Sequence, residues 1–397
     1  MRRRRDELAA RRRSRGLTQE ALAHRLQVGR TTVARWEAGD TTPLPWVRPL
    51  LADLLQISSG QLASLLRTDA CDPDITATPP PATPAHTAET TSAEDTAAAV
   101  RTTSAHIVAL DTRSGARHLV DVAVHAAQRA HRTAMSQFQA DRDVLAAAAE
   151  AQQVAGWVAF DAERQDLSRR MSLEALLSAR TAGNRSMEYL ALGQLAMQDV
   201  HLHQPVEAAN LASAALDNGV SGTVRTLFTL RAARAAAQMG EEARARDLLA
   251  RTRSSFLDGP HQHDPAWAWW LTEAEITWHE AMIEAEGGRW PRAAKRFRAA
   301  YQGTGVSTRA AASYRASLLW ALAHARAWNE AETVLVRDVL PHRDEVASVR
   351  AHRMLARAAQ LLDSARARPS LREAARQLTA DGSIAHETAG AQLLHTW

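Results

Sequence analysis

Apolar residues along most of the chain recur three and four positions apart, and strict alternation of apolar and polar residues is scarce. This spacing gathers apolar side chains on one face of an α-helix, whereas a half-buried strand needs a period of two. From Ile107 onward, alanine, leucine, arginine and glutamate dominate the chain. The pattern therefore predicts an all-α fold.

The helical part of the chain also repeats loosely. Five stretches place a small residue five positions after a small or charged one, at the start of a new helix, and they recur 37 to 48 residues apart: Glu163 to Ser168, His203 to Ala208, Gly240 to Ala245, Gly288 to Ala293 and Arg326 to Ala331. A weaker sixth unit extends from Val346 through Ala374. Each unit predicts a pair of helices, and the pairs stack because none buries its apolar face alone. The units resemble tetratricopeptide repeats, and a solenoid of helical pairs is the broader prediction.

A stretch rich in proline, threonine and alanine divides the chain. Residues 72–99 hold five of the fourteen prolines and almost no large apolar side chain. Such a segment cannot offset the entropy of ordering. We therefore predict three parts: a head at residues 1–70, a flexible tether at residues 71–105 and a helical-repeat body at residues 106–397.

The head carries a pattern of two short helices joined by a turn. The first begins near Thr18 and gathers three residues on one face, namely Leu22, Ala23 and Leu26. Ala23 stands where the helices cross, and a larger side chain there would push them apart. The second helix stops at Gly39; it turns Val33 and Trp36 inward and Arg30, Thr31 and Arg35 outward. This is the helix-turn-helix pattern, whose second helix lies in the major groove of DNA.

Residues 6–66 closely resemble the XRE family of lambda-repressor-like (Cro/cI-type) helix-turn-helix regulators. The resemblance rests on Gly16-Leu17-Thr18-Gln19, Trp36-Glu37 and Gly39, and it implies a five-helix bundle with its last helices at residues 45–56 and 59–66. Together with the tetratricopeptide-like body, it suggests an actinobacterial type of regulator.

The same resemblance implies roles for individual head residues. Gln19 would hold a phosphate, and Thr32 would lie near the DNA backbone. Arg30, Thr31 and Arg35 would face base edges. Arg12 would brace Glu37 and read nothing.

Charge supports a nucleic-acid partner for the head. Residues 1–70 hold thirteen arginines against seven acidic residues, a net +6 in a chain whose total is +4. The paired donors of arginine match O6 and N7 of guanine and discriminate by about 1–3 kcal/mol. Each neutralised phosphate makes the affinity more sensitive to salt. The run Arg2, Arg3, Arg4 and Arg5 is either an arm for an adjacent minor groove or a solvated charge patch.

The body offers weaker candidates for an effector groove. Trp267 and Trp270 are three apart, and Trp278 continues their stripe, a pattern that favours a packing face over a ligand pocket. Gln194 and Gln198 are four apart on one helix, and they form either an exposed polar stripe or part of a groove. Two His-x-His pairs, one followed by an aspartate, could suggest a metal site: His201, His203, His261, His263 and Asp264. We expect no metal, because these residues lack a third ligand at helical spacing.

Several function classes find no support in the sequence. No phosphate-binding glycine loop, nucleophile elbow or zinc-protease motif is present, so we expect neither an enzyme nor a cofactor. No apolar run approaches the roughly 20 residues of a membrane-spanning helix. The single cysteine, Cys71, and the lack of a secretory signal predict a cytoplasmic location, on the nucleoid when DNA is bound.

These patterns favour a sequence-specific transcription regulator that binds double-stranded DNA. We expect a homodimer, because two heads about 34–36 Å apart fit the half-sites of a palindrome. The body would mediate dimerisation and sense a peptide, a small molecule or a partner protein. The alternative is a scaffold whose repeats recruit a protein partner, with DNA contact secondary.

Overall fold

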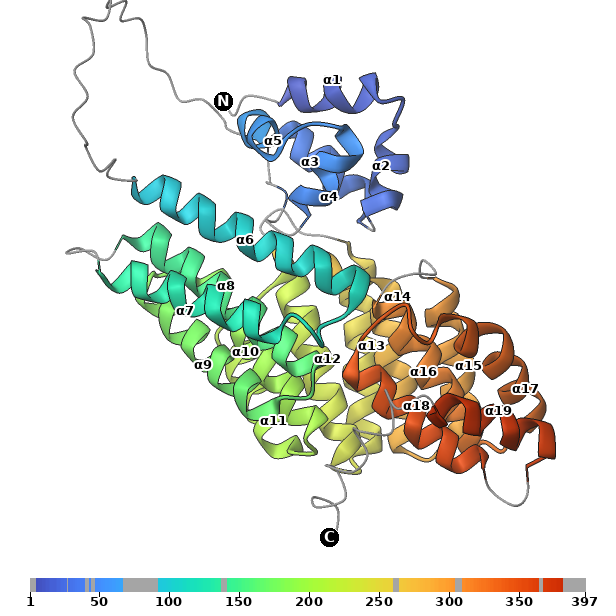
Figure 1. The fold of residues 1–397 in the computed structure, drawn as a ribbon. Helices are drawn as coiled ribbons and strands as arrows, with labels where there is room; N and C mark the ends of the chain where they lie inside the picture. Colours follow the sequence, from blue (N-terminus) through green and yellow to red (C-terminus); the bar gives the residue numbers. More distant parts are fainter. Residues whose placement is uncertain are drawn as a thin grey trace, which may run out of the picture.

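The computed structural model describes residues 5–26, 28–39, 43, 47–66, 92–136, 141–259, 264–303, 309–363 and 367–380. The regular elements in these ranges are all helices, which confirms the all-α prediction. Figure 1 shows a small helical head lying against one side of an elongated helical body.

The head follows the predicted helix-turn-helix pattern. Its helices are α1 (Asp6–Ser14), α2 (Gln19–Leu26), α3 (Arg30–Ala38), α4 (Arg48–Leu55) and α5 (Ser59–Leu66). The Thr18 hydroxyl accepts the Ala21 N–H at 3.0 Å, as an N-cap does, and Gly39 ends α3 with φ of 79°. The predicted core side chains are at most 4% exposed: Leu22, Ala23, Leu26, Val33 and Trp36. The sequence therefore placed the two central helices and their packing faces correctly.

The predicted tether is too long at its C-terminal end. Helix α6 (Ala93–Ser114) begins inside it, and Ala97 on α6 is fully buried. The Ser92 hydroxyl caps the helix by accepting the Asp95 N–H at 3.0 Å, and acidic residues in the first turn complement the helix dipole. The scarcity of large side chains suggested disorder, but the segment is rich in alanine, which is the strongest helix former. Residues 67–91 lie outside the described residues.

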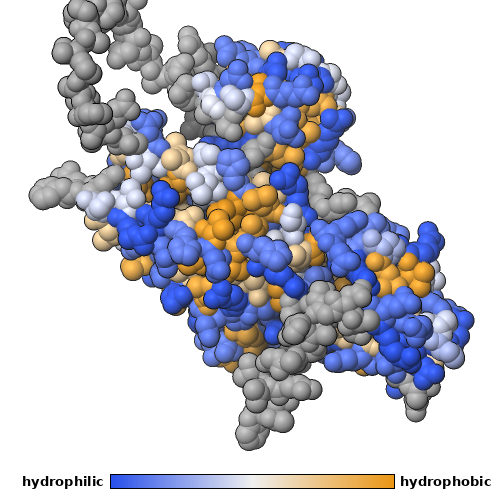
Figure 2. All heavy atoms as spheres, viewed as in Figure 1, coloured by the Kyte–Doolittle hydropathy of each residue, from blue (hydrophilic) through white to orange (hydrophobic). Residues whose placement is uncertain are grey.

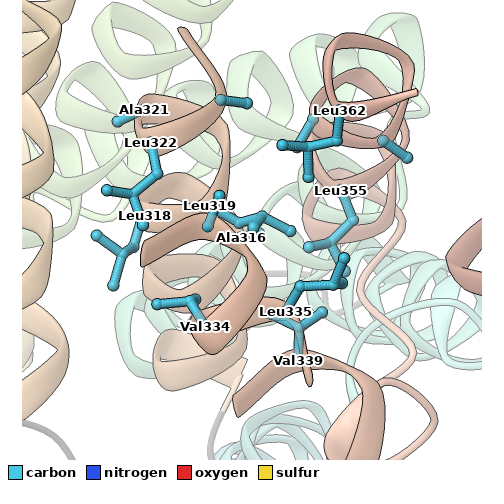
Figure 3. Packing of buried hydrophobic residues seen from close by; sticks show 14 of the residues in the cluster. Ala316, Leu318, Leu319, Ala321, Leu322, Val334, Leu335, Val339, Leu355 and Leu362 are labelled. Carbon is cyan, nitrogen blue, oxygen red and sulfur yellow. The ribbon is translucent and has the colours of Figure 1, made fainter. Parts of the chain in front are cut away.

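The body is a series of antiparallel helical pairs. After α6 and α7 (Val120–Ser136), the pairs are α8 (Arg142–Asp161) with α9 (Gln165–Thr181), α10 (Arg185–His201) with α11 (Pro205–Asp217), α12 (Gly222–Gln238) with α13 (Glu242–Leu257), α14 (Glu273–Glu286) with α15 (Trp290–Gln302), α16 (Arg309–His324) with α17 (Trp328–Val334), and α18 (Val349–Leu362) with α19 (Pro369–Ala380). Figure 3 shows how α16 and α18 bury leucines between them, Leu319 and Leu355 among them.

The five predicted repeat landmarks mark the turn inside each of the first five pairs. The first residue of every landmark has a positive φ between 55° and 76°. The N–H that follows it donates to the carbonyl five residues earlier, at 2.8–3.0 Å, which is the Schellman closure of a helix C-terminus. The second residue of every landmark is at most 1% exposed: Ser168, Ala208, Ala245, Ala293 and Ala331. A left-handed turn and a small contact residue thus define the repeat, which confirms the helical-pair interpretation.

Arg326 is an arginine at one of these left-handed turns, with φ of 55° and an exposed side chain. A residue with a Cβ is strained there by about 1–2 kcal/mol, and glycine is not. We therefore expect Arg326→Gly to raise the free energy of unfolding by up to about 1 kcal/mol. The matched control is Arg292→Gly, in the exposed first turn of α15, which is expected to lower it by about 1 kcal/mol. Chemical denaturation measures both, and equal losses would contradict the strain argument.

The stacked helical pairs of the body form a superhelix whose first and last parts contact each other. The Ala347 N–H donates to the Ser114 carbonyl at 2.8 Å, and the Arg117 N–H donates to the Ala347 carbonyl at 3.2 Å. At Gly115, φ is 80° and a Cβ would lie 2.6 Å from the Ala347 carbonyl carbon, so only glycine fits. The first and last parts of the body therefore meet, and α6 also packs against α16 (Figure 1).

Candidate nucleic-acid interface and central cavity

A buried ion pair ties the helices of the head together. Arg12 on α1 donates from Nε and Nη2 to the two carboxylate oxygens of Glu37 on α3, at 2.6 and 3.2 Å. Its Nη1 donates to the Leu17 carbonyl at 2.6 Å, and both charged residues are 8% exposed. The Gln19 amide donates to the same carboxylate at 2.8 Å. The structure thus contains the Arg12–Glu37 brace that the family resemblance implied, and the brace also orients Gln19.

Gln19 stands at the start of α2, where a shallow hollow of about 480 Å³ opens between α1 and α3. Arg13 and Arg30 line the same hollow. The first N–H groups of a helix have no partner within the helix and favour a negative charge. Arg30 keeps 60% of its side chain exposed and lies 3.9 Å from Glu20, a weak surface contact. This end of α2 therefore presents arginines and amide donors to the exterior.

The remaining predicted DNA residues line a different surface. Thr31 is exposed, whereas Thr32 and Arg35 are half-buried. All three line a large cavity whose other wall includes Asp111 on α6 and Glu150 on α8. In this arrangement, the face of α3 that was predicted to point outward is turned toward the body. Arg30 does not line this cavity.

Arg5 does not extend away from the head. Its N–H donates to the Glu37 carbonyl at 2.8 Å, its guanidinium donates to the Trp36 carbonyl, and it is 8% exposed. Arg5 therefore anchors the N-terminal segment to the end of α3, unlike the free arm considered for Arg2 to Arg5. Residues 1–4 lie outside the described part of the chain.

Charges of both signs meet where the head contacts the body. Helix α4 packs against α6. Burial lowers the pKa of Arg48 at the start of α4, and nearby Glu150 opposes that shift. Burial raises the pKa of Glu150 to about 7, against the attraction of Arg101 and Arg48. The junction thus holds a carboxyl group that titrates near neutral pH.

The same large cavity, which we call the central cavity, extends from the head along the inner helices of the body and has a volume of about 2050 Å³. Its wall is polar in places where a repeat core is normally apolar. Arg309 donates to Asp111 at 3.1 Å and lies over the Trp157 ring at 4.4 Å, and Arg353 donates to Glu163 at 2.8 Å. A second polar group, formed by α12 and α14, consists of Arg231, Arg234, Glu275 and His279.

Two of the four predicted groove residues line this cavity and two do not. Gln194 is 7% exposed and lines it, as does Trp270. Gln198 is instead 1% exposed and donates to the carbonyl and side chain of Gln165, so it links α10 to α9. Trp267 is 2% exposed and donates to the Ser186 carbonyl from the core.

The predicted tryptophan stripe does not belong to one helix. Trp267 and Trp270 lie in a short 3₁₀ helix, Ala266–Trp270, which ends before α14. Thr272 caps α14 by accepting the Glu275 N–H, so a new helix begins between Trp270 and Trp278. The three-residue spacing of Trp267 and Trp270 therefore does not reflect one face of a single α-helix.

The sequence reasoning missed the arginine pair on α12, although a signal was present. Between Leu227 and Ala237, all residues except Thr229, Arg231 and Arg234 are apolar. A helix that is apolar all round is buried, so its two arginines are buried as well.

The histidines considered as metal ligands form no cluster among the described residues. No group of three metal-ligand side chains occurs there, and His261 and His263 are not described. His201 instead lies 3.1 Å from Glu163. None of the described helices has the length and apolar character needed to cross a membrane.

Comparison with known proteins supports the assignment of the head. Residues 8–64 match a family model described as helix-turn-helix, and these residues contain α1 to α4 almost whole and most of α5. No curated protein and no solved structure matches the chain.

Proposed function

We propose that the protein is a sequence-specific transcription regulator that reads duplex DNA with α3. The observation that carries the proposal is the helix-turn-helix match over residues 8–64, together with the braced geometry that fixes α2 and α3. In the proposed complex, Arg30, Thr31 and Arg35 contact base edges, and Gln19 and Thr32 contact the backbone.

The position of α3 supports control by the body. Thr31, Thr32 and Arg35 line a cavity whose other wall belongs to the body, so in this position the body lies across the face that would meet a duplex. We infer that DNA binding requires the head to move away from α6 and α8. A body ligand that binds the two arrangements unequally would then regulate DNA binding.

We further propose that the body carries the dimer interface. Helices α6 and α7 expose three large apolar side chains: Leu110, Val122 and Met135. Figure 2 shows apolar atoms gathered at the surface of the body beneath the head. Exposed apolar surface of this kind is typical of association sites. Two heads joined through their bodies match the two half-sites of a palindrome.

The decisive experiment selects genomic fragments bound by the full chain and then compares variants on the preferred site. Arg35→Ala is expected to weaken the preferred site by about 1–3 kcal/mol and to relax the preference at one base pair. Gln19→Ala is expected to weaken all sites alike, because a phosphate contact reads no sequence. Titration by fluorescence anisotropy at several salt concentrations measures both.

Arg246→Ala is the control, because Arg246 is an exposed arginine of α13 on the body. It is expected to leave both affinity and preference unchanged. Unaltered base preference in Arg35→Ala would overturn the assignment of α3. Weak binding of every fragment, erased by salt, would instead favour the scaffold function.

A further inference from the structure

Two buried arginines on the inner wall of the body donate no hydrogen bond to a carboxylate among the described residues. Arg231 and Arg234 lie on α12, are 3% and 4% exposed, and line the central cavity. Elsewhere on this wall, Arg309 and Arg353 donate directly to carboxylates. Arg234 comes no closer than 3.7 Å to Glu286, which is beyond a hydrogen bond.

The one close partner of both arginines is His279. Arg231 Nη1 lies 3.2 Å from His279 Nε2, and Arg234 Nη1 lies 3.2 Å from His279 Nδ1. Burial lowers the pKa of His279 to about 4, so the ring is neutral at pH 7. A neutral imidazole has one acceptor nitrogen, and a guanidinium only donates. At most one of the two arginines can therefore donate a hydrogen bond to His279.

Glu275 makes the choice between them. Its Oε1 lies 3.4 Å from His279 Nε2, and its Oε2 accepts the Tyr314 hydroxyl at 2.6 Å. A carboxylate beside Nε2 favours the tautomer that carries the proton there, which leaves Nδ1 to accept from Arg234. Arg231 then faces an N–H group, and no other described side chain lies within hydrogen-bonding distance of its guanidinium. A buried charge without an acceptor is strongly unfavourable unless a partner is supplied.

The surroundings of the pair combine further donors with apolar surface. Gln194 is 93% buried, and its amide nitrogen has no partner among the described residues. Leu227, one turn before Arg231 on α12, lines the same cavity. The Trp278 ring centre lies 5.9 Å from the Arg234 guanidinium carbon. Donors at the centre and apolar side chains beside them suit an amphipathic molecule with an anionic end.

We propose that Arg231 and Arg234 form the anion subsite of a ligand cavity, which binds the carboxylate or phosphate group of a small amphipathic molecule. The inference deepens the proposed effector-sensing role of the body and rests on it. The anion supplies the acceptor that Arg231 lacks, and the apolar part of the ligand lies along Leu227 and Trp278.

The test uses the full chain without DNA and three probes: decanoate, the uncharged decanol, and inorganic phosphate. Tryptophan fluorescence reports occupancy, because Trp278 lies beside the arginine pair. Decanoate is expected to bind at least about tenfold more tightly than decanol, since hydrogen bonds to a charged group distinguish the two probes. Stronger binding of phosphate than of decanoate would identify a phosphate group as the natural anion.

Arg231→Met is expected to remove the preference for decanoate over decanol and the response to phosphate. Arg357→Gln is the matched control, because Arg357 is an exposed arginine of the same cavity wall, and it should bind like the wild type. Arg231→Met without ligand should also unfold at the same temperature as the wild type or higher, because an uncompensated buried charge is removed. A purely structural arginine would lower that temperature instead.

The proposal is overturned if neither anion binds the wild type, or if wild type and Arg231→Met bind both anions equally. DNA retention is measured on the same preparations. If the wild type retains DNA but binds neither anion, only this inference is rejected. If the wild type does not retain DNA, the proposed function is rejected.

Discussion

Replacing Glu37 by alanine is expected to unfold the head and abolish DNA retention. The substitution leaves the Arg12 guanidinium, 8% exposed, without its carboxylate. Breaking a buried pair by removing one partner costs about 3–5 kcal/mol. That is comparable to the whole stability of a domain of this size, whose small core seldom supplies more than about 3–5 kcal/mol. Scanning calorimetry of the full chain should show loss of the head transition while the body transition remains.

Glu20→Ala is the matched control for this prediction. Glu20 also faces an arginine, Arg30, but at 3.9 Å and with 78% of its side chain exposed. Exposed pairs of this kind contribute about 0–1 kcal/mol, so the head transition should barely move. Equal effects of the two alanine substitutions would show that the brace does not hold the head together.

Glu37→Gln separates folding from DNA contact. It keeps the shape of the side chain and removes its charge, so it is expected to destabilise the head less than alanine does. Gln19 loses a charged acceptor in either variant, because its amide donates to the same carboxylate. Where the head still folds, weaker binding at every site would identify Glu37 as the group that positions Gln19.

The head was predictable because its determinants are local. The N-cap at Thr18, the small crossing residue Ala23 and the stop at Gly39 lie within one short segment, and each acts on its own neighbours. The same holds inside each repeat. Each left-handed turn, such as those at His203 and Arg326, is followed five positions later by a buried small residue. A short stretch of sequence therefore contains the whole signal.

The features that failed prediction depend on distant contacts. The closure between Ser114 and Ala347 joins segments more than two hundred residues apart, and no periodic pattern encodes it. The spacing of Gln198 predicted an exposed polar stripe or part of a groove, yet its bond to Gln165 on the neighbouring helix buries it in the wall. Alanine-rich sequence around Ala97 was taken for tether because composition does not report the surface that buries it.

Helix α6 connects the closure to the head. Its C-terminal part carries Asp111, which accepts from Arg309 on α16, and α6 also contacts α4 of the head. Helix α6 thus belongs to the closure and is also the element against which the head rests. Contiguous packing of this kind carries coupling between two sites only where the head has two discrete positions.

Asp161→Ala is expected to open the superhelix. Asp161 is fully buried at the end of α8 and accepts from the Ser348 hydroxyl at 3.0 Å and from Arg350 at 3.4 Å. Arg309 Nη1 lies 3.8 Å away. Removing the carboxylate takes a partner from each of these groups, and we expect a loss of about 3–5 kcal/mol from the free energy of unfolding. Denaturant unfolding measures the loss, and small-angle scattering should report a larger radius of gyration.

Two controls separate the charge from the cavity that the substitution leaves. Asp161→Asn keeps an acceptor for Ser348 and is expected to lose less, about 1–3 kcal/mol. Asp217→Ala, at the exposed end of α11, should stay within about 0.5 kcal/mol of the wild type. If the closure restrains the head, Asp161→Ala should also raise the affinity for the preferred DNA site, because α6 no longer holds α4 in place. An Asp161→Ala protein that keeps both its size and its DNA affinity would show that the closure neither holds the body shut nor governs the head.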